Sequence, residues 1–216
     1  MKFLIAATVA FVAWMTWAAS PVSYAGNGGA ISTVNSSVRA EAGKTYGDLS
    51  TVNGDVSVGQ GATAGSASTV NGNIRIDNDA RLDNASTVNG SVRVSEGVQI
   101  EREAHTVNGD IQMRPRSRVG GDVETVSGDI ELAGAEVGGT LRTHNGDIEL
   151  TEGAHVRGGI LVKQSKGWGS SKKPINVRIC STCVVDGELR FERPVKLTVE
   201  NGARIGAVIG DEVIRN

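Results

Sequence analysis

The chain has 216 residues, a formal net charge of −2 and a hydrophobic fraction of 39%. The near-neutral charge argues against a nucleic-acid-binding protein and against electrostatic attachment to a membrane surface. Only 4% of the residues are aromatic, and 29 are glycine. Both values favour a thin core of small and branched aliphatic side chains.

Residues 1–25 predict a signal peptide. An apolar run follows a short positive start, and Ser23 and Ala25 place small residues at −3 and −1 of a cleavage site before Gly26. The alternative is an uncleaved membrane anchor, although the apolar run is short for a membrane span. We therefore expect an exported mature chain that does not span a membrane and resides in the periplasm or at the cell surface. Residues 26–30 would form an N-terminal linker or cap.

Residues 31–162 are built from repeats. The unit at residues 50–58 reads Ser-Thr-Val-Asn-Gly-Asp-Val-Ser-Val, and its valine position recurs from Val34 to Val162 with spacings of 18, 18, 18, 19, 19, 18 and 18 residues. A fixed period just below 20 residues indicates a solenoid. Pairs of apolar or small residues recur about every six positions within each repeat, which predicts three short strands per coil. We expect an all-β fold: a single-domain parallel β-helix with triangular coils of 18–19 residues.

Irregularities in this pattern suggest where the coils change. The two 19-residue spacings add one residue before Val107 and one before Val126, and we expect a bulge at each place. A loop at residues 163–174 interrupts the repeats. Strands of the terminal coils and a cap are expected at residues 175–216.

Three columns of aliphatic side chains are expected to point into the coil because they alternate with polar residues. They are Val34, Val52, Val70, Val88, Val107 and Val126; Val56, Ile74, Val92, Ile111, Ile130 and Ile148; and Val58, Ile76, Val94, Met113, Leu132 and Leu150. The column expected to point outward beside the first of these is Thr33, Thr51, Thr69, Thr87, Thr106, Thr125 and Thr143. An exposed threonine array is also typical of ice-binding surfaces, but simple stacking of β-branched side chains is favoured. On this assignment, Val88→Asp destabilises the protein far more than Thr87→Asp.

A column of asparagines follows in the repeat: Asn35, Asn53, Asn71, Asn89, Asn108 and Asn145. Asparagine tolerates the left-handed backbone of a sharp corner, and stacked side-chain amides can hydrogen-bond from coil to coil. Because repeated turn chemistry normally serves the fold, we expect a structural ladder and no catalytic or ligand-binding role.

Outward charges are segregated along the repeats, with Arg75 and Arg93 early and carboxylates later. The later residues are Asp110, Asp129, Glu131, Asp147 and Glu149. Carboxylates stacked one coil apart repel each other, so Asp129 and Asp147 are candidate Ca²⁺ ligands, and paired carboxylates also occur in polysaccharide-cleaving enzymes. The short coils offer no walled cleft and no aromatic platform for sugars. We therefore expect a solvated acidic face, no catalysis and no cofactor.

The basic loop at residues 163–174 carries the one tryptophan that follows the signal segment. Loops that interrupt a regular scaffold are common sites of function, so the candidate partner-binding residues are Lys166, Trp168, Lys172 and Lys173. Cationic groups beside one large ring suit an anionic envelope polymer or a protein partner. The alternative is a flexible excursion in which Trp168 packs on the solenoid.

Cys180 and Cys183 are the only cysteines, and in an exported chain they are expected to form a disulfide that closes a local turn. A redox-active pair would need a helix N-terminus, and a zinc site would need more than two ligands. His105, His144 and His155 lack metal-ligand spacing and are expected to be surface or turn residues.

The units at residues 51–58, 125–132 and 143–150 resemble the β-strand repeats of secreted bacterial adhesin-like proteins. The short sub-period and triangular coil also resemble the bactofilins, which polymerise end to end. Bactofilins are cytoplasmic, so the predicted signal peptide of this chain differs from that family. The resemblance implies an architecture and brings no catalytic residues. The predicted function is that of an exported, non-catalytic structural or adhesive protein of the envelope or surface. The open alternatives are a polysaccharide lyase or hydrolase that uses the acidic face, and a scaffold that associates end to end.

Overall fold

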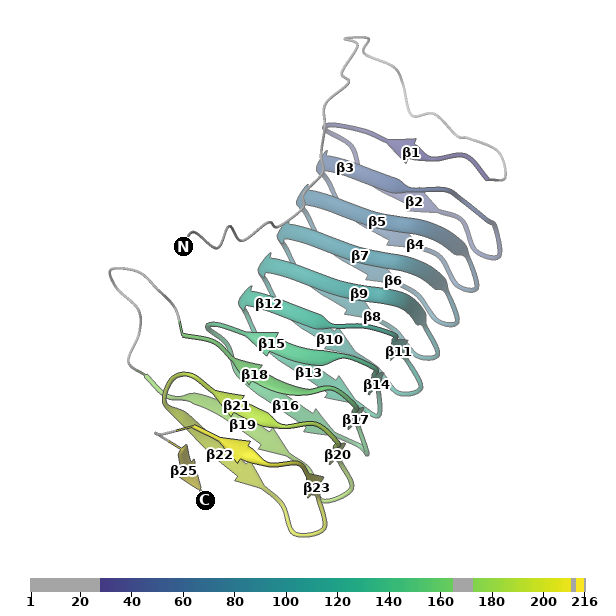
Figure 1. The fold of residues 1–216 in the computed structure, drawn as a ribbon. Coiled ribbons are helices and arrows are strands. Elements are labelled where there is room, and N and C mark those ends of the chain that lie inside the picture. Colours follow the sequence, from purple (N-terminus) through teal and green to yellow (C-terminus); the bar gives the residue numbers. More distant parts are fainter. Residues whose placement is uncertain (1–27, 165–172, 211–212, 216) are drawn as a thin grey trace.

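The computed structural model describes residues 28–164, 173–210 and 213–215. The predicted signal segment at residues 1–25 and residues 165–172 of the predicted loop lie outside the described residues. Within the described residues every regular element is a β-strand, which confirms the all-β class. Successive coils stack in sequence order from β1 (Ile31–Ser32) at one end to β25 (Val213–Arg215) at the other (Figure 1).

The described strands pair in parallel within two sheets, which confirms the parallel β-helix. The 10-stranded sheet contains β2 (Val38–Ala40), β4 (Val56–Val58), β6 (Ile74–Ile76), β8 (Val92–Val94), β10 (Ile111–Met113), β13 (Ile130–Ala133), β16 (Ile148–Thr151), β19 (Ile175–Ile179), β22 (Val195–Val199) and β25. The 15-stranded sheet contains β1, β3 (Leu49–Asn53), β5 (Thr63–Asn71), β7 (Arg81–Asn89), β9 (Gln99–Asn108), β11 (Arg118–Val119), β12 (Val123–Ser127), β14 (Glu136–Val137), β15 (Thr140–Thr143), β17 (His155–Val156), β18 (Gly159–Val162), β20 (Val184–Val185), β21 (Leu189–Phe191), β23 (Arg204–Ile205) and β24 (Val208–Ile209). Because β9 pairs with both β11 and β12, one long strand per early coil becomes two strands in each later coil.

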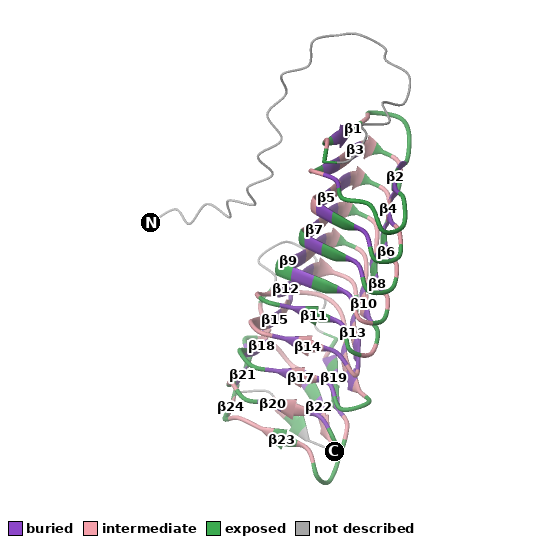
Figure 2. Cartoon of the chain, turned by 90° about the vertical axis from the view of Figure 1, so that its right-hand side faces the viewer, coloured by how far each residue is buried: buried purple, intermediate pink, exposed green. Residues whose placement is uncertain are grey.

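Two of the three predicted inward columns are confirmed. The columns that begin at Val56 and Val58 pair coil to coil in the 10-stranded sheet, as in Val56↔Ile74 and Val58↔Ile76, and all their members are buried. Buried and exposed residues alternate along the strands (Figure 2). Removing this aliphatic surface from water, at about 25 cal/mol per Å², is the main stabilising contribution of the thin core.

The prediction for the remaining valine column is wrong, because the threonines face the core and the valines face outward. Thr87 is 1% exposed, whereas Val88 is half-buried and Val34 is 40% exposed. The buried threonines are Thr51, Thr69, Thr87, Thr106, Thr125 and Thr143. Each hydroxyl in this set except that of Thr143 donates to a carbonyl oxygen at a corner of the preceding coil. A buried Thr side chain is therefore compatible with the core, and the array suggested as an ice-binding surface is not exposed.

The strand as a whole determines this register. The residues two positions before the threonines are apolar and buried: Leu49, Ala67, Ala85, Ala104, Val123 and Leu141. The positions between them include Glu124 and Arg142, which are half-buried on the outer face. Because alternate residues of a strand share a face, the valines lie on the same side as these charged groups. Thr143 is the exception in its column, since its buried Oγ1 has no hydrogen-bond partner among the described residues.

One of the two predicted bulges is present. The pairing of β7 with β9 shifts from Leu82↔Ile100 to Asn84↔Glu103, which places the additional residue shortly before Val107. The bulge predicted before Val126 is wrong, because β9 pairs with β11 and β12 at one constant offset. The next coil contains the same additional residue as β9, so the two coils pair without a further shift. Val162 also departs from the predicted column, since it pairs with buried Thr143.

Glycine follows every asparagine of this column after Asn35, because neighbouring coils approach closely at this corner. A Cβ atom on Gly72, Gly90 or Gly146 would overlap the carbonyl oxygen of the glycine stacked below it in the preceding coil. Glycine is the one residue that allows this backbone contact.

Candidate functional site

Hydrogen bonds link stacked asparagine side chains along one corner of the solenoid. From Asn53 onward, each Nδ2 donates to Oδ1 of the asparagine one coil earlier, at 2.8–2.9 Å; the linked residues are Asn35, Asn53, Asn71, Asn89 and Asn108. Ser127 occupies the next position, so Asn145 lies apart from this ladder. Its Oδ1 instead accepts a hydrogen bond from Arg193 Nη1 at 2.6 Å.

A second ladder, which sequence reasoning missed, runs through the residue directly before β2, β4, β6, β8, β10, β13 and β16. Its side-chain oxygen accepts a hydrogen bond from the backbone N–H of the equivalent residue one coil later, at 2.7–3.3 Å. We call this set the corner-acceptor column: Ser37, Asp55, Asn73, Ser91, Asp110, Asp129 and Asp147. The sequence signal was the restriction to Ser, Asp and Asn, the short side chains that accept from nearby backbone N–H groups.

The candidate Ca²⁺ ligands are both members of the corner-acceptor column. Asp129 Oδ1 accepts from Asp147 N at 2.7 Å, and Asp147 accepts from both N and Nδ2 of Asn176. Among the described residues, no group of three or more His, Cys, Asp or Glu side chains is placed to hold a metal ion. In this geometry the carboxylates join successive coils.

The two outward glutamates of the acidic face lie side by side, with Glu131 paired in register with Glu149. Arg114 Nη1 lies 3.5 Å from Glu131 Oε1, and Arg178 Nη1 lies 3.0 Å from Glu149 Oε1. A polysaccharide-cleaving site needs a pair of carboxyl groups that can meet the sugar directly. Each of these two groups instead already has a cationic neighbour on the surface.

A polar pocket of about 330 Å³ lies over β11, β14 and β17. Its wall includes Glu136, which pairs with Arg157 Nη2 at 2.5 Å, and His155, whose Nε2 lies 2.7 Å from Asp186 Oδ2. Ser117 also lines the pocket, but its hydroxyl donates to a backbone carbonyl of the same turn. Glu136 and His155 are thus engaged with the next coil, and Ser117 is not arranged as a nucleophile.

The described residues on either side of residues 165–172 are tied to the turn between β21 and β22. Gln164 N donates to Glu192 Oε2 at 3.3 Å, and Arg193 Nη2 donates to Lys173 O at 3.0 Å. Arg193 Nη1 also donates to the carbonyl oxygen of His144 at 2.7 Å. We call Gln164, Lys173, Glu192 and Arg193 the loop base.

Lys173 is the one predicted partner-binding residue that the structure describes, and it is exposed. Lys166, Trp168 and Lys172 lie outside the described residues. Sequence reasoning did not identify Arg193, because its contacts are to residues 20 and 49 positions away. The only available signal was the Glu-Arg-Pro turn that breaks the alternation after Phe191.

His144 occupies the outward valine column beside the loop base. Burial lowers the pKa of His144, and the Lys163 ammonium lowers it further, whereas Glu124 and Glu192 act in the opposite direction. Its Nδ1 atom is buried and has no hydrogen-bond partner among the described residues. The imidazole is therefore expected to be neutral at pH 7. Of the other histidines, His105 lies half-buried on the outer face of β9, in keeping with a surface position.

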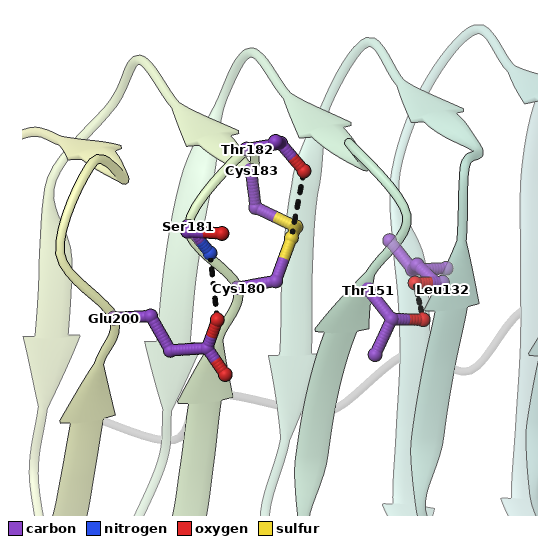
Figure 3. The surroundings of a disulfide bond; sticks show 7 residues. All are labelled: Leu132, Thr151, Cys180, Ser181, Thr182, Cys183 and Glu200. Carbon is purple, nitrogen blue, oxygen red and sulfur yellow. Dashed lines mark hydrogen bonds between the residues drawn. A yellow bond between two sulfur atoms is a disulfide. The ribbon is translucent and has the colours of Figure 1, made fainter.

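Cys180 and Cys183 form a disulfide that closes the turn between β19 and β20 (Figure 3). Thr182 Oγ1 lies 3.4 Å from Cys180 Sγ, and the hydroxyl is the donor because a disulfide sulfur carries no hydrogen. Glu200 Oε2 from the next coil accepts from Ser181 N at 3.0 Å. A disulfide is typical of proteins in oxidising compartments.

Fold and contacts together define a single-domain parallel β-solenoid whose repeated polar side chains join its coils. No family model, curated protein or solved structure matches the chain. The adhesin-like and bactofilin-like resemblance therefore stays a prediction from the repeat units. Over residues 28–164, 173–210 and 213–215, no helix is long and apolar enough to cross a membrane.

Proposed function

We propose that this chain is an exported, non-catalytic β-solenoid that serves as a structural or adhesive protein of the cell envelope or surface. The observation that carries this proposal is the use of the repeated polar side chains. Asn, Thr and corner-acceptor residues are hydrogen-bonded to an adjacent coil, so the repeats work as a scaffold. Regular columns suit stacking better than selection of one partner.

Partner binding is assigned to the segment at residues 163–174. Its support is the loop base, where Glu192 and Arg193 hold the described residues on both sides of the irregular stretch. The sequence places Lys166, Lys172 and Lys173 around Trp168. Ammonium groups beside one large ring fit an anionic envelope polymer or an acidic groove of a protein partner.

Export is supported by the signal-like N-terminus and by the Cys180–Cys183 disulfide. N-terminal sequencing of protein recovered from the periplasmic and extracellular fractions tests it. We expect the mature chain to begin at Gly26. Recovery of the intact chain in the cytoplasm, with both cysteines reactive toward a thiol reagent, would reject export.

A capture experiment tests the binding segment. The full chain and a variant with residues 166–173 replaced by a Gly/Ser linker are compared for retention of envelope polymers and proteins. A second variant, Lys166→Gln/Lys172→Gln/Lys173→Gln, keeps Trp168 and removes only the charge. Lys196→Gln, an exposed lysine on β22, is the matched control. We expect loss with both loop variants and none with the control. Equal capture by all four proteins, with equal melting temperatures, would contradict the assignment.

A further inference from the structure

The outer face of the 10-stranded sheet carries a charge pattern that the scaffold role leaves unexplained. The middle residues of five consecutive strands form one straight column, with the pairing Arg75↔Arg93, Arg93↔Gln112, Gln112↔Glu131 and Glu131↔Glu149. We call these five residues the charged column. Two arginines are followed by a neutral amide and then by two glutamates, so the column is basic at one end and acidic at the other.

Within one chain this arrangement is unfavourable. Side chains directly opposite each other on adjacent strands are close, and like charges there are destabilising. Arg75 and Arg93 are such a pair, and both are exposed. Arg93 forms no hydrogen bond or ion pair with any residue that the structure describes.

Intramolecular ion pairs relieve the repulsion in part. Arg75 Nε lies 3.0 Å from Asp77 Oδ1, with exposed fractions of 67% and 37% for the two side chains. Arg178 pairs with Glu149, with exposed fractions of 61% and 45% for the two side chains in that order. Ion pairs this open to solvent contribute little to stability, so these groups remain available to a second binding partner.

We propose that the charged column is the contact face of a symmetric dimer formed by two copies of this chain. The twofold axis lies in the interface and runs along β10 at Gln112. Rotation about this axis reverses the order of the coils but keeps the strand direction. Arg75 then faces the partner's Glu149, Arg93 faces the partner's Glu131, and Gln112 faces the partner's Gln112.

Charge complementarity selects this arrangement over the other face-to-face dimer. A twofold axis parallel to the solenoid axis would keep the coil order and place arginines against arginines and glutamates against glutamates. In the proposed dimer, all four charged residues of each column meet an opposite charge. Two side-chain amides face each other at the axis, and an amide carries both donor and acceptor groups.

The size and the rim of this face predict a weak association. Five strands about 4.8 Å apart give a contact on the order of 400 Å² per partner, below the roughly 800 Å² of a standard interface. Farther from the axis, Ser57 on β4 would face the partner's Arg178 on β19, and Arg39 on β2 would face the partner's Thr198 on β22, so no further ion pairs extend the contact beyond the central coils. We therefore expect a reversible dimer that dissociates as salt screens the ion pairs.

Sedimentation equilibrium of the purified full chain tests the proposal, at salt concentrations of about 0.02 M and about 0.5 M. The wild type should approach twice the monomer mass at low salt and return to the monomer at high salt. Arg75→Glu/Arg93→Glu and Glu131→Arg/Glu149→Arg should each be monomeric, since each column then carries one sign of charge. An equimolar mixture of the two variants should form a heterodimer, because their columns are complementary. The mixture also shows that both variants are folded.

Arg81→Glu/Arg204→Glu is the matched control, with the same change in charge at exposed arginines of the 15-stranded sheet. It should dimerise as the wild type does. Three results would overturn the proposal: a wild type that stays monomeric throughout the low-salt series, dimerisation that survives in either column variant, or no heterodimer in the mixture. Assemblies larger than a dimer that form equally in the wild type and in all of these variants would also contradict the proposal and would indicate self-association through the ends of the solenoid.

Discussion

Thr87 Oγ1 lies 2.9 Å from the carbonyl oxygen of Gly72, and this hydrogen bond joins two successive coils from inside the core. It reverses the expected effect of two neighbouring substitutions. Thr87→Asp should cost roughly 3–5 kcal/mol, because it buries a carboxylate without a cationic partner. Val88→Asp, on the outer face, should change the stability by about 1 kcal/mol or less.

Thermal denaturation followed by circular dichroism measures this difference. Thr87→Val is a useful third variant, since it keeps the shape of the side chain but leaves the Gly72 carbonyl without its donor. A loss of about 1–2 kcal/mol is expected for it. If Val88→Asp proves more damaging than Thr87→Asp, the threonines do not face the core.

The corner-acceptor column predicts that Asp147 tolerates an amide but not a methyl group. Asp147→Asn keeps an acceptor for the backbone N–H of Asn176 and should change stability by less than about 1 kcal/mol. Asp147→Ala removes the acceptor and should cost about 1–3 kcal/mol. Urea denaturation of the two variants provides the comparison, and equal midpoints would show that the side chain does not join the coils.

The same pair of variants addresses catalysis. We expect no cleavage of polyuronate or peptidoglycan substrates by the wild type, because the carboxylates of the acidic face are engaged with backbone groups and arginines. Reducing-end and unsaturated-product assays measure this. Turnover by the wild type that disappears in Asp147→Asn while the fold is retained would support a polysaccharide-cleaving enzyme instead.

His144 predicts a stability that falls on mild acidification. Its pKa is lowered in the folded protein from the ordinary value of 6.5, so the unfolded chain binds the proton more readily. Stability is therefore complete above pH 6.5 and decreases as the pH falls through the lowered pKa. Melting temperatures from about pH 8 to about pH 5.5 measure the slope. His144→Gln should flatten it, and an unchanged slope in that variant would exclude His144 as the cause.

The disulfide should act locally. Cys180→Ser/Cys183→Ser opens a very short loop, for which chain-entropy arguments give about 2 kcal/mol. Coils of a solenoid contact only their neighbours, so hydrogen exchange should accelerate near β19, β20 and β23 more than in β5 and β7. Uniform acceleration along the whole chain would contradict a local role.

Much of the fold was predictable because its hydrophobic columns repeat with little variation. Val56, Ile74 and their successors alternate cleanly, and the period alone indicated parallel stacking. The exchange of Thr87 and Val88 escaped prediction because valine is the more hydrophobic of the two. Hydrophobicity does not show that the threonine hydroxyl finds a carbonyl in the preceding coil. The charged residues Glu124 and Arg142, which lie between the buried positions of these strands, were the better guide to the outer face.

The loop base was less accessible to prediction. Arg193 contacts His144 and Lys173 across 49 and 20 residues, and neither distance is a multiple of the repeat. These contacts depend on where the irregular turn after β21 places the Arg193 side chain, and no local sequence pattern predicts that position. The corner-acceptor column, in contrast, could have been found from its restricted choice of residues.

The corner-acceptor column also makes the length of the molecule adjustable. Each side chain of the column accepts the same backbone N–H hydrogen bond from the next coil. A coil can therefore form this bond with any coil that presents an equivalent residue. Deleting residues 73–90 would join Gly72 to Ser91, let Asp55 accept from Ser91 N, and bring Thr106 over the Gly72 carbonyl in place of Thr87. The rod would become shorter by one strand spacing, about 4.8 Å, with its columns still aligned. Gene duplication or loss of one such unit can therefore set the reach of this protein without requiring a new fold.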